Sequence, residues 1–587
     1  MSIINYGDEP ILQVSNLTVD FMRDGEYRQV VHGVNFSLFR GKTLGIVGES
    51  GSGKSVTSMS VMRLLKTPPA RIRGSIIYNE YPDSSQKPVP TDLLGLSESQ
   101  MLHYRGKHIA MIFQEPMTSL NPVQKCGQQV VEMLMAHESV SSKEAKRRTI
   151  ELFQEVMLPR PESIFDSYPH EISGGQKQRV MIAMALICHP DILIADEPTT
   201  ALDVTVQKAI VELLKQLQQK YGIAIIFISH DLGVIGQIAD DVAVMYKGEI
   251  VEQGTAKDIL YHPQHPYTQG LLACRPPLDS RPRRLKTLAD FVDNGAAHDF
   301  SKQQVGTEKV SRQEPSEDKK EVLLSVRQLV VSYALKKNFF GKPIQTLNAV
   351  DGVSFDIFKN ETLGLVGESG CGKSTLGRSI LRLIESHSGQ VSYQGVALNQ
   401  LSARKMKQLR PKLQIVFQDP YSSLNPRLTV GEAILEPLRL YGKTLEGNPL
   451  TDRKAMRQRV MDLLEQVGLS ADHYGRYPHE FSGGQRQRIC IARALIMNPE
   501  LVICDESVSA LDVSVQAQVL NLLNDLKERY GYTYLFITHD LSVVKFISDR
   551  IMVMQKGRII EMGTADDIYR SPQMEYTKKL LDAIPRI

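Results

Sequence analysis

The 587-residue sequence has few of the features that mark secreted or metal-stabilised proteins. It contains only six cysteines, and no two of them form a C-x-x-C pair or another metal-ligand spacing. We therefore expect reduced thiols, with neither disulfide bonds nor a zinc site. The six are Cys126, Cys188, Cys274, Cys371, Cys490 and Cys504.

Long apolar segments are also missing. The first residues, Met1 to Glu9, contain no basic stretch followed by an apolar one, so we expect no signal peptide. The longest apolar runs, such as Ala224 to Ile228, fall far short of the roughly 20 residues that a membrane-spanning helix needs. We expect that the chain does not cross a membrane and that any role at a membrane depends on a partner.

Neither sign of charge dominates the sequence. Its 69 basic and 66 acidic residues nearly cancel, which leaves a formal net charge of +3. Proteins that bind nucleic acid concentrate positive charge to match the phosphate backbone. Nucleic acid is therefore not an expected partner.

What the sequence does contain is a set of five motifs that occurs twice. In each half, G-x-x-x-x-G-K-[ST] is followed by a glutamine after an apolar run, by S-G-G-Q, by an apolar run ending in Asp-Glu, and by an apolar run ending in His-Asp. Five ordered motifs in duplicate leave almost no room for coincidence. Since a chain of this length is also too long for one core, we predict two similar domains.

The repeat divides the chain into residues 1–274, 275–321 and 322–587. The middle segment is polar, charged and interrupted by proline and glycine, which predicts a linker with little structure of its own. Its short apolar piece, Leu285 to Val292, is a candidate for docking elsewhere. The first half is longer than the second between its first two motifs, and Tyr81 to Gln100, rich in Ser, Pro and Asp, is the expected insertion.

Short apolar runs end where the polar motifs begin. Leu44 to Val47 leads into the first glycine-rich motif, Ile192 to Ala195 into the first Asp-Glu, and Ala224 to Ile228 into the first His-Asp. Such runs are typical of parallel strands buried on both faces, and ligands of such sheets bind at the carboxyl ends of the strands. Before the first S-G-G-Q the pattern becomes helical, as in Lys143 to Glu155.

The two glycine-rich motifs predict phosphate binding. Their glycines allow backbone N–H groups to surround phosphates at a helix N-terminus, the lysine reaches the β- and γ-phosphates, and the last hydroxyl binds Mg²⁺. The residues predicted to bind the nucleotide are Gly48, Ser50, Gly51, Gly53, Lys54 and Ser55 in the first motif and Gly367, Ser369, Gly370, Gly372, Lys373 and Ser374 in the second.

The remaining motifs supply acidic and polar side chains at strand ends. The aspartate of Asp-Glu is predicted to hold Mg²⁺, and the glutamate to accept a proton from the attacking water. The glutamine is predicted to bind Mg²⁺ or that water, and the histidine to contact the γ-phosphate; for all of them, a purely structural capping role is the alternative. The catalytic candidates are Glu197, Glu506, His230, His539, Gln114 and Gln418, and the Mg²⁺ candidates are Ser55, Gln114, Asp196, Ser374, Gln418 and Asp505.

Together these motifs resemble the ATP-binding cassette (ABC) family over nearly the whole chain apart from the linker. The diagnostic element is the S-G-G-Q signature, which a generic phosphate-loop ATPase does not need. The resemblance implies an α/β fold with two P-loop NTPase domains in tandem, each with a RecA-like core, an antiparallel β subdomain and a helical signature subdomain. The signature residues are Ser173, Gly174, Gly175 and Gln176 in the first half and Ser482, Gly483, Gly484 and Gln485 in the second.

In the family, two cassettes pair head to tail, and the signature of one closes over the ATP held by the other. The resemblance therefore implies that the cassettes pair within this one chain. Lys54 would share an ATP site with Ser482, and Lys373 with Ser173.

The resemblance also implies two smaller elements. One is a D-loop, matched by Ala201 to Asp203 and Ala510 to Asp512. The other is an aromatic side chain that stacks on adenine, for which Phe21 and Tyr333 are the candidates, with Tyr27 competing in the first half.

Finer features resemble the branch that imports oligopeptides, dipeptides, nickel and glutathione. They are S-L-N-P after each glutamine, Y-P-H-E before each signature, and H-P-Y-T at 265–268. This branch implies an ATP-hydrolysing subunit at the cytoplasmic face of the inner membrane. Its partners would be two transmembrane permease subunits, docked near the segments after Gln114 and Gln418, and an extracytoplasmic solute-binding protein.

Three departures from the branch and one rival class remain. Cys274 stands alone where the branch often has a cysteine cluster, so no iron–sulfur cluster is expected. Ser507 replaces a proline, and Cys371 lies within the second glycine-rich motif, either as a small packing residue or as a redox-sensitive thiol. The rival is a soluble tandem cassette acting on ribosomes, which usually has a long charged helical linker in place of the proline-broken one seen here.

Overall fold

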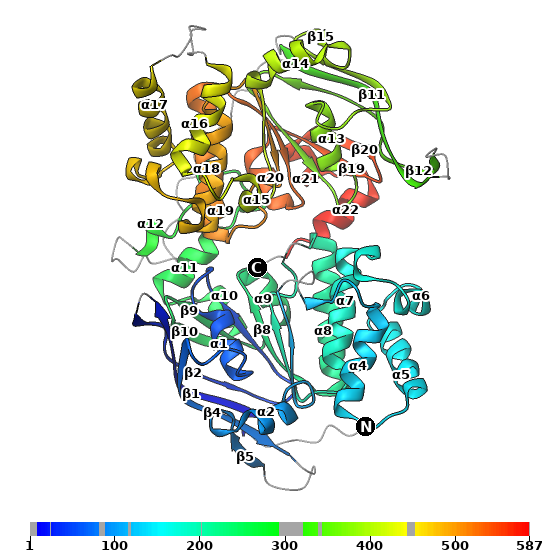
Figure 1. The fold of residues 1–587 in the computed structure, drawn as a ribbon, viewed down its shortest axis with the longest axis vertical. Helices are drawn as coiled ribbons and strands as arrows, with labels where there is room; N and C mark the ends of the chain where they lie inside the picture. Colours follow the sequence, from blue (N-terminus) through cyan, green and yellow to red (C-terminus); the bar gives the residue numbers. More distant parts are fainter. Residues whose placement is uncertain are drawn as a thin grey trace.

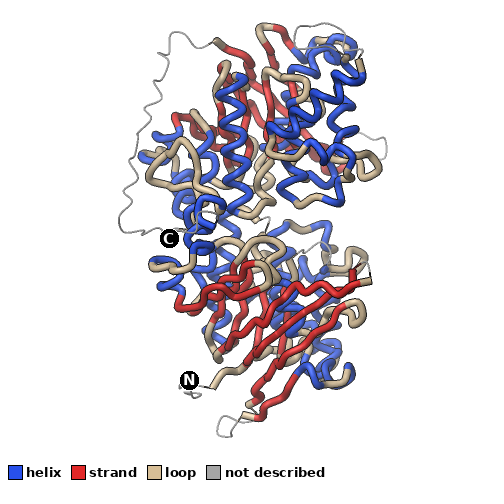
Figure 2. Tube along the Cα trace, turned by 90° about the vertical axis from the view of Figure 1, so that its left-hand side faces the viewer, coloured by secondary structure: helices blue, strands red, loops and turns tan. Residues whose placement is uncertain are grey.

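The computed structural model describes residues 9–23, 25–81, 88–114, 119–200, 202–292, 321–337, 343–442 and 452–585. They form two similar bodies, which we call the first cassette (9–274) and the second cassette (321–585). Figure 1 shows the first cassette below the second, and Figure 2 shows the two bodies meeting largely through helices and loops.

A six-stranded sheet forms the centre of the first cassette, in the order β10-β9-β3-β8-β7-β6. The strands β6, β7, β8, β3 and β9 run parallel, and β10 pairs with β9 in the antiparallel sense. The predicted parallel strands are thus confirmed. The strands are β3 (Thr43–Val47), β6 (Ile109–Ile112), β7 (Ile192–Asp196), β8 (Ala224–Ser229), β9 (Asp241–Tyr246) and β10 (Glu249–Thr255).

The second cassette repeats this sheet in the order β16-β17-β18-β13-β19-β20. Its glycine-rich loop follows β13, which lies between β18, the strand that ends at the His-Asp motif, and β19, which pairs with the antiparallel edge strand β20. The strands are β13 (Thr362–Val366), β16 (Leu413–Val416), β17 (Leu501–Asp505), β18 (Thr533–Ile537), β19 (Arg550–Gln555) and β20 (Arg558–Thr564).

Each cassette also has a four-stranded antiparallel sheet, ordered β2-β1-β4-β5 in the first and β12-β11-β14-β15 in the second. The β4–β5 connection is long, and 82–87 within it lie outside the described residues, whereas β14 and β15 are joined by Gln394 and Gly395 alone. Part of the expected insertion therefore lies in this hairpin. The strands are β1 (Leu12–Arg23), β2 (Glu26–Leu38), β4 (Ala70–Glu80), β5 (Val89–Asp92), β11 (Val322–Lys337), β12 (Pro343–Phe358), β14 (Ser388–Tyr393) and β15 (Val396–Ala397).

Most helices cover the face of each six-stranded sheet that lies away from the antiparallel sheet. In the first cassette and the segment after it the helices are α1 (Lys54–Val61), α2 (Glu98–Tyr104), α4 (Cys126–His137), α5 (Ser142–Glu155), α6 (Pro161–Phe165), α7 (Gly174–Leu186), α8 (Val204–Tyr221), α9 (Leu232–Ile238), α10 (Ala256–Tyr261), α11 (Pro266–Ala273) and α12 (Ala289–Val292). In the second cassette they are α13 (Lys373–Ile380), α14 (Ala403–Leu409), α15 (Pro420–Ser423), α16 (Val430–Tyr441), α17 (Arg453–Gln466), α18 (Gly483–Leu495), α19 (Val513–Tyr530), α20 (Leu541–Ile547), α21 (Ala565–Arg570) and α22 (Glu575–Asp582). Of these helices, α1, α2, α13 and α14 pack instead on the antiparallel side.

The strand β7 shows why these apolar runs have no polar alternation. Ile192 and Ile194 pack with the antiparallel sheet, whereas Leu193 and Ala195 pack with the helices on the opposite face. Both faces are buried, so every position is apolar until the strand reaches Asp196 at its carboxyl end. The carboxyl ends of β3, β7 and β8 therefore place the polar motifs at one edge of the sheet.

Candidate functional site

The glycine-rich loops join a buried strand to a helix and need glycine at defined places. A Cβ at Gly48 would lie 2.2 Å from the carbonyl oxygen of Met245, and one at Gly367 would lie 2.2 Å from that of Met554. Gly53 has a φ of 101°, a left-handed conformation that favours glycine, and no side chain caps the helix α1 that follows. The N–H groups of the first turn of α1 are thus available to a phosphate.

Each loop lysine folds back over its own loop. Lys54 Nζ donates to the carbonyl oxygens of Gly48 and Glu49 at 2.6 and 2.9 Å, and burial lowers its pKa. Lys373 makes the same two contacts in the second loop, at 2.8 and 3.0 Å. These carbonyls position a buried ammonium group inside the curve of the loop, where it can meet phosphate oxygens. Cys371 is buried inside the second loop, and burial raises the pKa of its thiol.

Of the residues predicted to hold Mg²⁺, the serines and aspartates lie together in pairs, whereas Gln114 and Gln418 contact the neighbouring glutamates. Ser55 Oγ donates to Asp196 Oδ1 at 3.0 Å, and Ser374 Oγ donates to Asp505 Oδ1 at 2.6 Å. Burial raises the pKa of Asp196 to about 6 despite the hydrogen bond from Ser55, and burial likewise raises the pKa of Asp505. A buried carboxylate beside a hydroxyl is the oxygen-rich setting that suits a hard divalent cation, so these residues fit Mg²⁺.

Glu197 is the centre of a hydrogen-bonded cluster in the first cassette. Its Oε2 accepts from Gln114 Nε2 at 3.1 Å and from Thr200 Oγ1 at 2.8 Å, and it lies 3.3 Å from His230 Nδ1. Burial alone would raise the pKa of Glu197, but His230 and Thr200 lower it to about 2 overall. Burial opposes protonation of His230, yet the Glu197 carboxylate raises its pKa. The glutamate is therefore ionised, and side chains that follow β6, β7 and β8 converge on it.

The second cassette repeats this cluster with looser histidine geometry. Gln418 Nε2 donates to Glu506 Oε2 at 2.7 Å, whereas His539 Nδ1 lies 3.6 Å from that oxygen, beyond hydrogen-bond distance. Lys373 Nζ lies 3.8 Å from Glu506 Oε1. Burial raises the pKa of Glu506, but the nearby His539 and Lys373 lower it overall.

Both catalytic candidates also adopt an unusual backbone conformation. Glu197 has a φ of 47° and Glu506 a φ of 48°, in the left-handed region that non-glycine residues rarely occupy. A constraint of this kind persists only when surrounding contacts stabilise it. It turns each glutamate away from the line of its strand, so that it faces the glutamine and the histidine.

The structure adds one side chain that the motifs did not single out. Arg378 Nη2 lies 3.5 Å from Asp505 Oδ2, and its guanidinium lies 6.0 Å from the centre of the Phe417 ring. The position equivalent to Arg378, five residues after the loop lysine, is Met59 in the first cassette. The two sites thus differ in charge next to the buried aspartate. From the sequence, only this difference between the two halves could have pointed to Arg378.

Comparison with known proteins agrees with this geometry. The ABC transporter family model matches residues 31–200 and 350–509. The glutathione import ATP-binding protein GsiA of Salmonella paratyphi A is 48% identical, over 98% of this chain and 89% of that protein. The chain belongs to the ABC transporter family. It is an ATPase of that family, built from two cassettes in one chain.

Further similarities cover parts or all of this ABC ATPase. The model for the C-terminal region of oligopeptide/dipeptide transporters matches residues 251–299 and 560–587. GsiA of Escherichia coli O157:H7 is 47% identical, over 98% of this chain and 89% of that protein. The dimeric structure of a bacterial ABC transporter cassette covers 41% of this chain and 99% of its own, with 27% identity and a TM-score of 0.37.

The two cassettes of this ABC ATPase contact each other through their phosphate loops and the segments that lead into α8 and α19. Ser50 donates through its backbone N–H and its hydroxyl to Asp512 of the second cassette, at 3.0 and 3.1 Å. In return, the Ser369 N–H donates to Asp203 of the first cassette at 3.4 Å. Ser514 also donates to Glu49 across the contact, and burial raises the pKa of Glu49 to about 7. Ala201, the first residue of the predicted D-loop, lies outside the described residues.

The signature serines cap the helices α7 and α18. Ser173 Oγ accepts from the Gln176 N–H at 3.3 Å, and Ser482 Oγ accepts from the Gln485 N–H at 3.4 Å. Both serines are exposed. Among the described hydrogen bonds and ion pairs, none joins a signature residue to the opposite phosphate loop, so the proposed sharing of each ATP site remains a prediction.

The candidate adenine-stacking residues occupy matching positions in β1 and β11. Phe21 follows the buried Val19 by two residues, and Tyr333 follows the buried Val331 by two. Phe21 is partly packed against the core, whereas Tyr333 is exposed. The guanidinium of Arg71 lies 3.8 Å from the centre of the competing Tyr27 ring and occupies one of its faces.

Two further features bear on the predicted role at a membrane. No helix among the described residues is both long and apolar enough to span a bilayer. The second cassette has a groove of about 290 Å³ whose lining runs from β16 to α16 and α18 and includes Phe417, next to Gln418, and the exposed Leu440. In the first cassette, 115–118, just after Gln114, lie outside the described residues.

Proposed function

We propose that this chain is the energy-coupling subunit of an importer for peptides or related small solutes, of the dipeptide, oligopeptide, glutathione and nickel class. The observation that carries the proposal is the complete hydrolytic cluster in each of two paired cassettes. The import direction and the solute class rest on the relatives named above and on the matching C-terminal regions. We place the chain at the cytoplasmic face of the inner membrane, with two permease subunits and an extracytoplasmic solute-binding protein as partners.

The proposed division of labour follows the contacts. Lys54 and Lys373 would leave their loop carbonyls to neutralise the phosphates of ATP. Mg²⁺, held by the Ser55–Asp196 pair and by its counterpart in the second cassette, would supply further positive charge at the β- and γ-phosphates. Glu197 would orient and deprotonate the attacking water, while Gln114 and His230 position it.

We propose domain boundaries at 1–274, 275–321 and 322–587. Supporting them, β1 begins at Leu12 and β11 at Val322, so each cassette starts with the same strand of its antiparallel sheet. The first nucleotide-binding domain would end after α11, which closes at Ala273.

We further propose that the groove in the second cassette receives a segment of a permease. It is lined by apolar Phe417 and Leu440 and by the ion pair of Arg493 with Glu436, whose closest atoms lie 3.6 Å apart. The groove borders Gln418, which is hydrogen-bonded to Glu506, so a segment bound there would bear directly on the hydrolytic cluster. Tyr421, exposed on α15, extends this surface.

Charge placed on this surface should release the chain from membranes. We expect the wild-type chain to remain in the supernatant when expressed alone and to sediment with membranes when its permeases are co-expressed. Leu440→Glu or Tyr421→Glu should weaken that association by roughly tenfold or more, because the interface would then have to bury a carboxylate in place of an apolar or aromatic side chain. Sedimentation and basal ATP hydrolysis are the measurements, and hydrolysis should persist.

Tyr261→Glu is the matched control, since Tyr261 is an exposed aromatic on α10 of the first cassette. It should sediment like the wild type. Co-purification of the chain with ribosomes and no association with permeases would favour the ribosomal rival over transport. The candidate Met117, which follows Gln114, lies outside the described residues, so the test is confined to the second cassette.

A further inference from the structure

The segment after α11 lies along the second cassette. Figure 1 shows α11 and α12 at the contact between the two bodies, beside α19. We call residues 278–292 the strap. Composition alone suggested a linker with little structure, yet the strap makes hydrogen bonds and ion pairs with the second cassette and apolar contacts with both cassettes.

The centre of the strap is fixed by one buried amide. Asn521 on α19 accepts a hydrogen bond from the Leu285 N–H through Oδ1 and donates to the Leu285 carbonyl through Nδ2, both at 2.9 Å. Asn521 is 2% exposed and Leu285 3% exposed. Without the strap, the amide would lose both of these hydrogen bonds, and the core of the second cassette would lose the Leu285 side chain.

The start of the strap is tied to the second cassette by charge. Lys545 donates to the Leu278 carbonyl, and Arg281 Nε donates to the Phe546 carbonyl at 3.0 Å. Arg281 also lies 3.5 Å from Asp549. The strap therefore contacts α19, α20 and the residues that follow α20.

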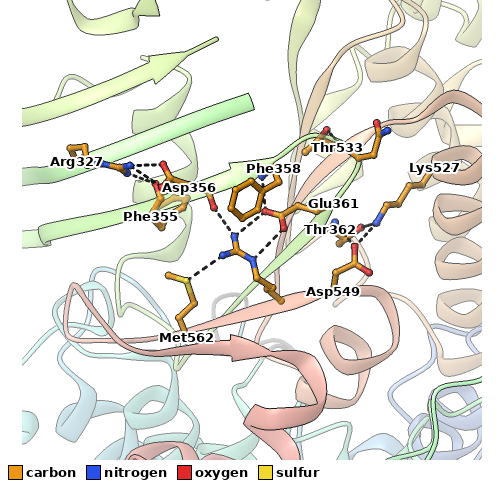
Figure 3. Close-up of polar contacts among 12 residues, drawn as sticks. Arg327, Phe355, Asp356, Phe358, Glu361, Thr362, Lys527, Thr533, Asp549 and Met562 are labelled. Carbon is orange, nitrogen blue, oxygen red and sulfur yellow. Dashed lines mark hydrogen bonds and ion pairs between the residues drawn. The ribbon is translucent and has the colours of Figure 1, made fainter. Parts of the chain in front are cut away.

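Asp549 links the strap to the second phosphate loop. Its Oδ2 accepts from the Thr362 N–H at 2.9 Å and from Lys527 Nζ at 2.7 Å, and Figure 3 shows these three side by side. Thr362 is the first residue of β13, the strand that leads into that loop. The Asp549 side chain is 30% exposed, and its carboxylate keeps a lowered pKa because Lys527, the Thr362 N–H and Arg281 outweigh the effect of burial.

The end of the strap returns to the first cassette. Leu288 packs against the apolar cores of both cassettes, and Phe291 is buried. A Cβ at Gly270 of α11 would lie 2.6 Å from Leu288 Cδ2 and 3.4 Å from Phe291 Cδ2, so the strap sits directly on that helix. Cys274 is fully buried and packs with the core of the second cassette.

The residues of α19 beneath the strap suit burial, whereas the equivalent residues of α8 in the first cassette do not. Asn521 is the ninth residue of α19, and the ninth residue of α8 is Glu212, which is exposed. Three residues later, the buried Asn524 corresponds to the exposed Lys215. Uncharged amides thus occupy α19 where α8 has charges that favour water.

We propose that the strap holds the two cassettes together when no nucleotide is bound, through these contacts and not merely through chain continuity. The loop-to-loop contacts across the cassettes involve exposed polar groups such as Ser50, which contribute little in water. The strap supplies the buried apolar part of the contact. ATP would then move two cassettes that are already associated. The contacts of the strap would stay in place while the rest of the cassettes move relative to each other.

The test separates contact from covalent linkage. A protease recognition sequence inserted between Gln303 and Gln304 allows the purified full chain to be cut after the strap. We expect the two fragments of the cut wild-type chain to co-elute on size-exclusion chromatography without nucleotide. Leu285→Asp should raise the dissociation constant of the fragments by about tenfold or more, and Asn521→Ala should act in the same direction.

Ala289→Asp, an exposed substitution within the strap, and Glu212→Ala, at the matching position of α8, are the controls and should leave the fragments together. Separation of the cut wild-type fragments without nucleotide, or no effect of Leu285→Asp, would overturn the proposal. Hydrogen exchange in the uncut, nucleotide-free chain gives an independent readout. The Leu285 amide should be protected, and exchange at the rate of an unfolded peptide would equally refute the strap.

Discussion

Replacing Glu197 and Glu506 together by glutamine is expected to cut ATP turnover by roughly 10²–10⁴-fold, while ATP binding persists. The physical reason is specific. Each glutamate is an ionised carboxylate held by a glutamine and faced by a histidine at the end of the His-Asp strand. Glutamine keeps the shape and the hydrogen-bonding capacity but cannot accept a proton from water. ATP should then keep the two cassettes closed on each other.

The measurements are steady-state phosphate release and equilibrium binding of ATP. Glu151→Gln combined with Glu465→Gln is the control, because both residues are exposed on helices remote from the loops. It should hydrolyse ATP like the wild type. Turnover that survives the Glu197 and Glu506 double change would remove both residues from the mechanism.

The two single variants need not behave alike. Thr200 donates its hydroxyl to the Glu197 carboxylate, whereas Ser509 donates to the backbone carbonyl of Glu506. Lys373 lies near Glu506, and Arg378 adds a positive charge beside the aspartate of the second site only. The two glutamates therefore differ in their contacts: Glu197 has an additional hydroxyl donor and the closer histidine, whereas Glu506 has a lysine 3.8 Å away. Comparison of the single variants would measure that difference.

Much of the fold was predictable because a strand that is buried on both faces has a continuous apolar sequence. The run Ile192 to Ala195 could be assigned to a parallel strand since both faces of β7 are covered. The same reasoning placed the polar motifs at one edge, and the contact of Gln114 with Glu197 agrees with it. The helix expected over Lys143 to Glu155 is α5, which begins one residue earlier.

What could not be predicted depends on contacts between segments far apart in the chain. The segment 275–321 is rich in charge and interrupted by proline, so its composition indicated a linker. The position of the strap within it depends on contacts with residues more than two hundred positions away, among them Asn521, Phe546 and Asp549. An asparagine in an amphipathic helix such as α19 carries no signal of what covers it. The contact of Asp512 with Ser50 likewise follows from the packing of the cassettes, which no local pattern encodes.

The pairing of the cassettes determines which signature serves which ATP. Asp512, one step before α19, contacts the loop that contains Lys54, so the second cassette reaches into the first site. Ser482, exposed at the start of α18, belongs to the same cassette. Its helix N-terminus can contribute to binding a γ-phosphate held by the first loop. We therefore expect Ser482→Arg to obstruct the site that contains Lys54.

A double substitution tests this assignment. Lys54→Ala removes the phosphate-binding ammonium of the first loop, and Ser482→Arg would damage the same site. Their combination should leave one nucleotide bound where the wild type binds two, and its loss of binding should not exceed that of the more severe single change. Titration with a non-hydrolysable ATP analogue under calorimetry gives the stoichiometry.

The matched control keeps Lys54→Ala and places the arginine in the other signature. Ser173→Arg would obstruct the site that contains Lys373, so its combination with Lys54→Ala should abolish binding at both sites. If the cassettes worked independently, the two combinations would exchange their outcomes: Ser173→Arg with Lys54→Ala would spare one nucleotide, and Ser482→Arg with Lys54→Ala would lose both. The reversal is qualitative, because each combination predicts either one occupied site or none. It therefore separates head-to-tail sharing from independent sites without relying on the size of any single effect.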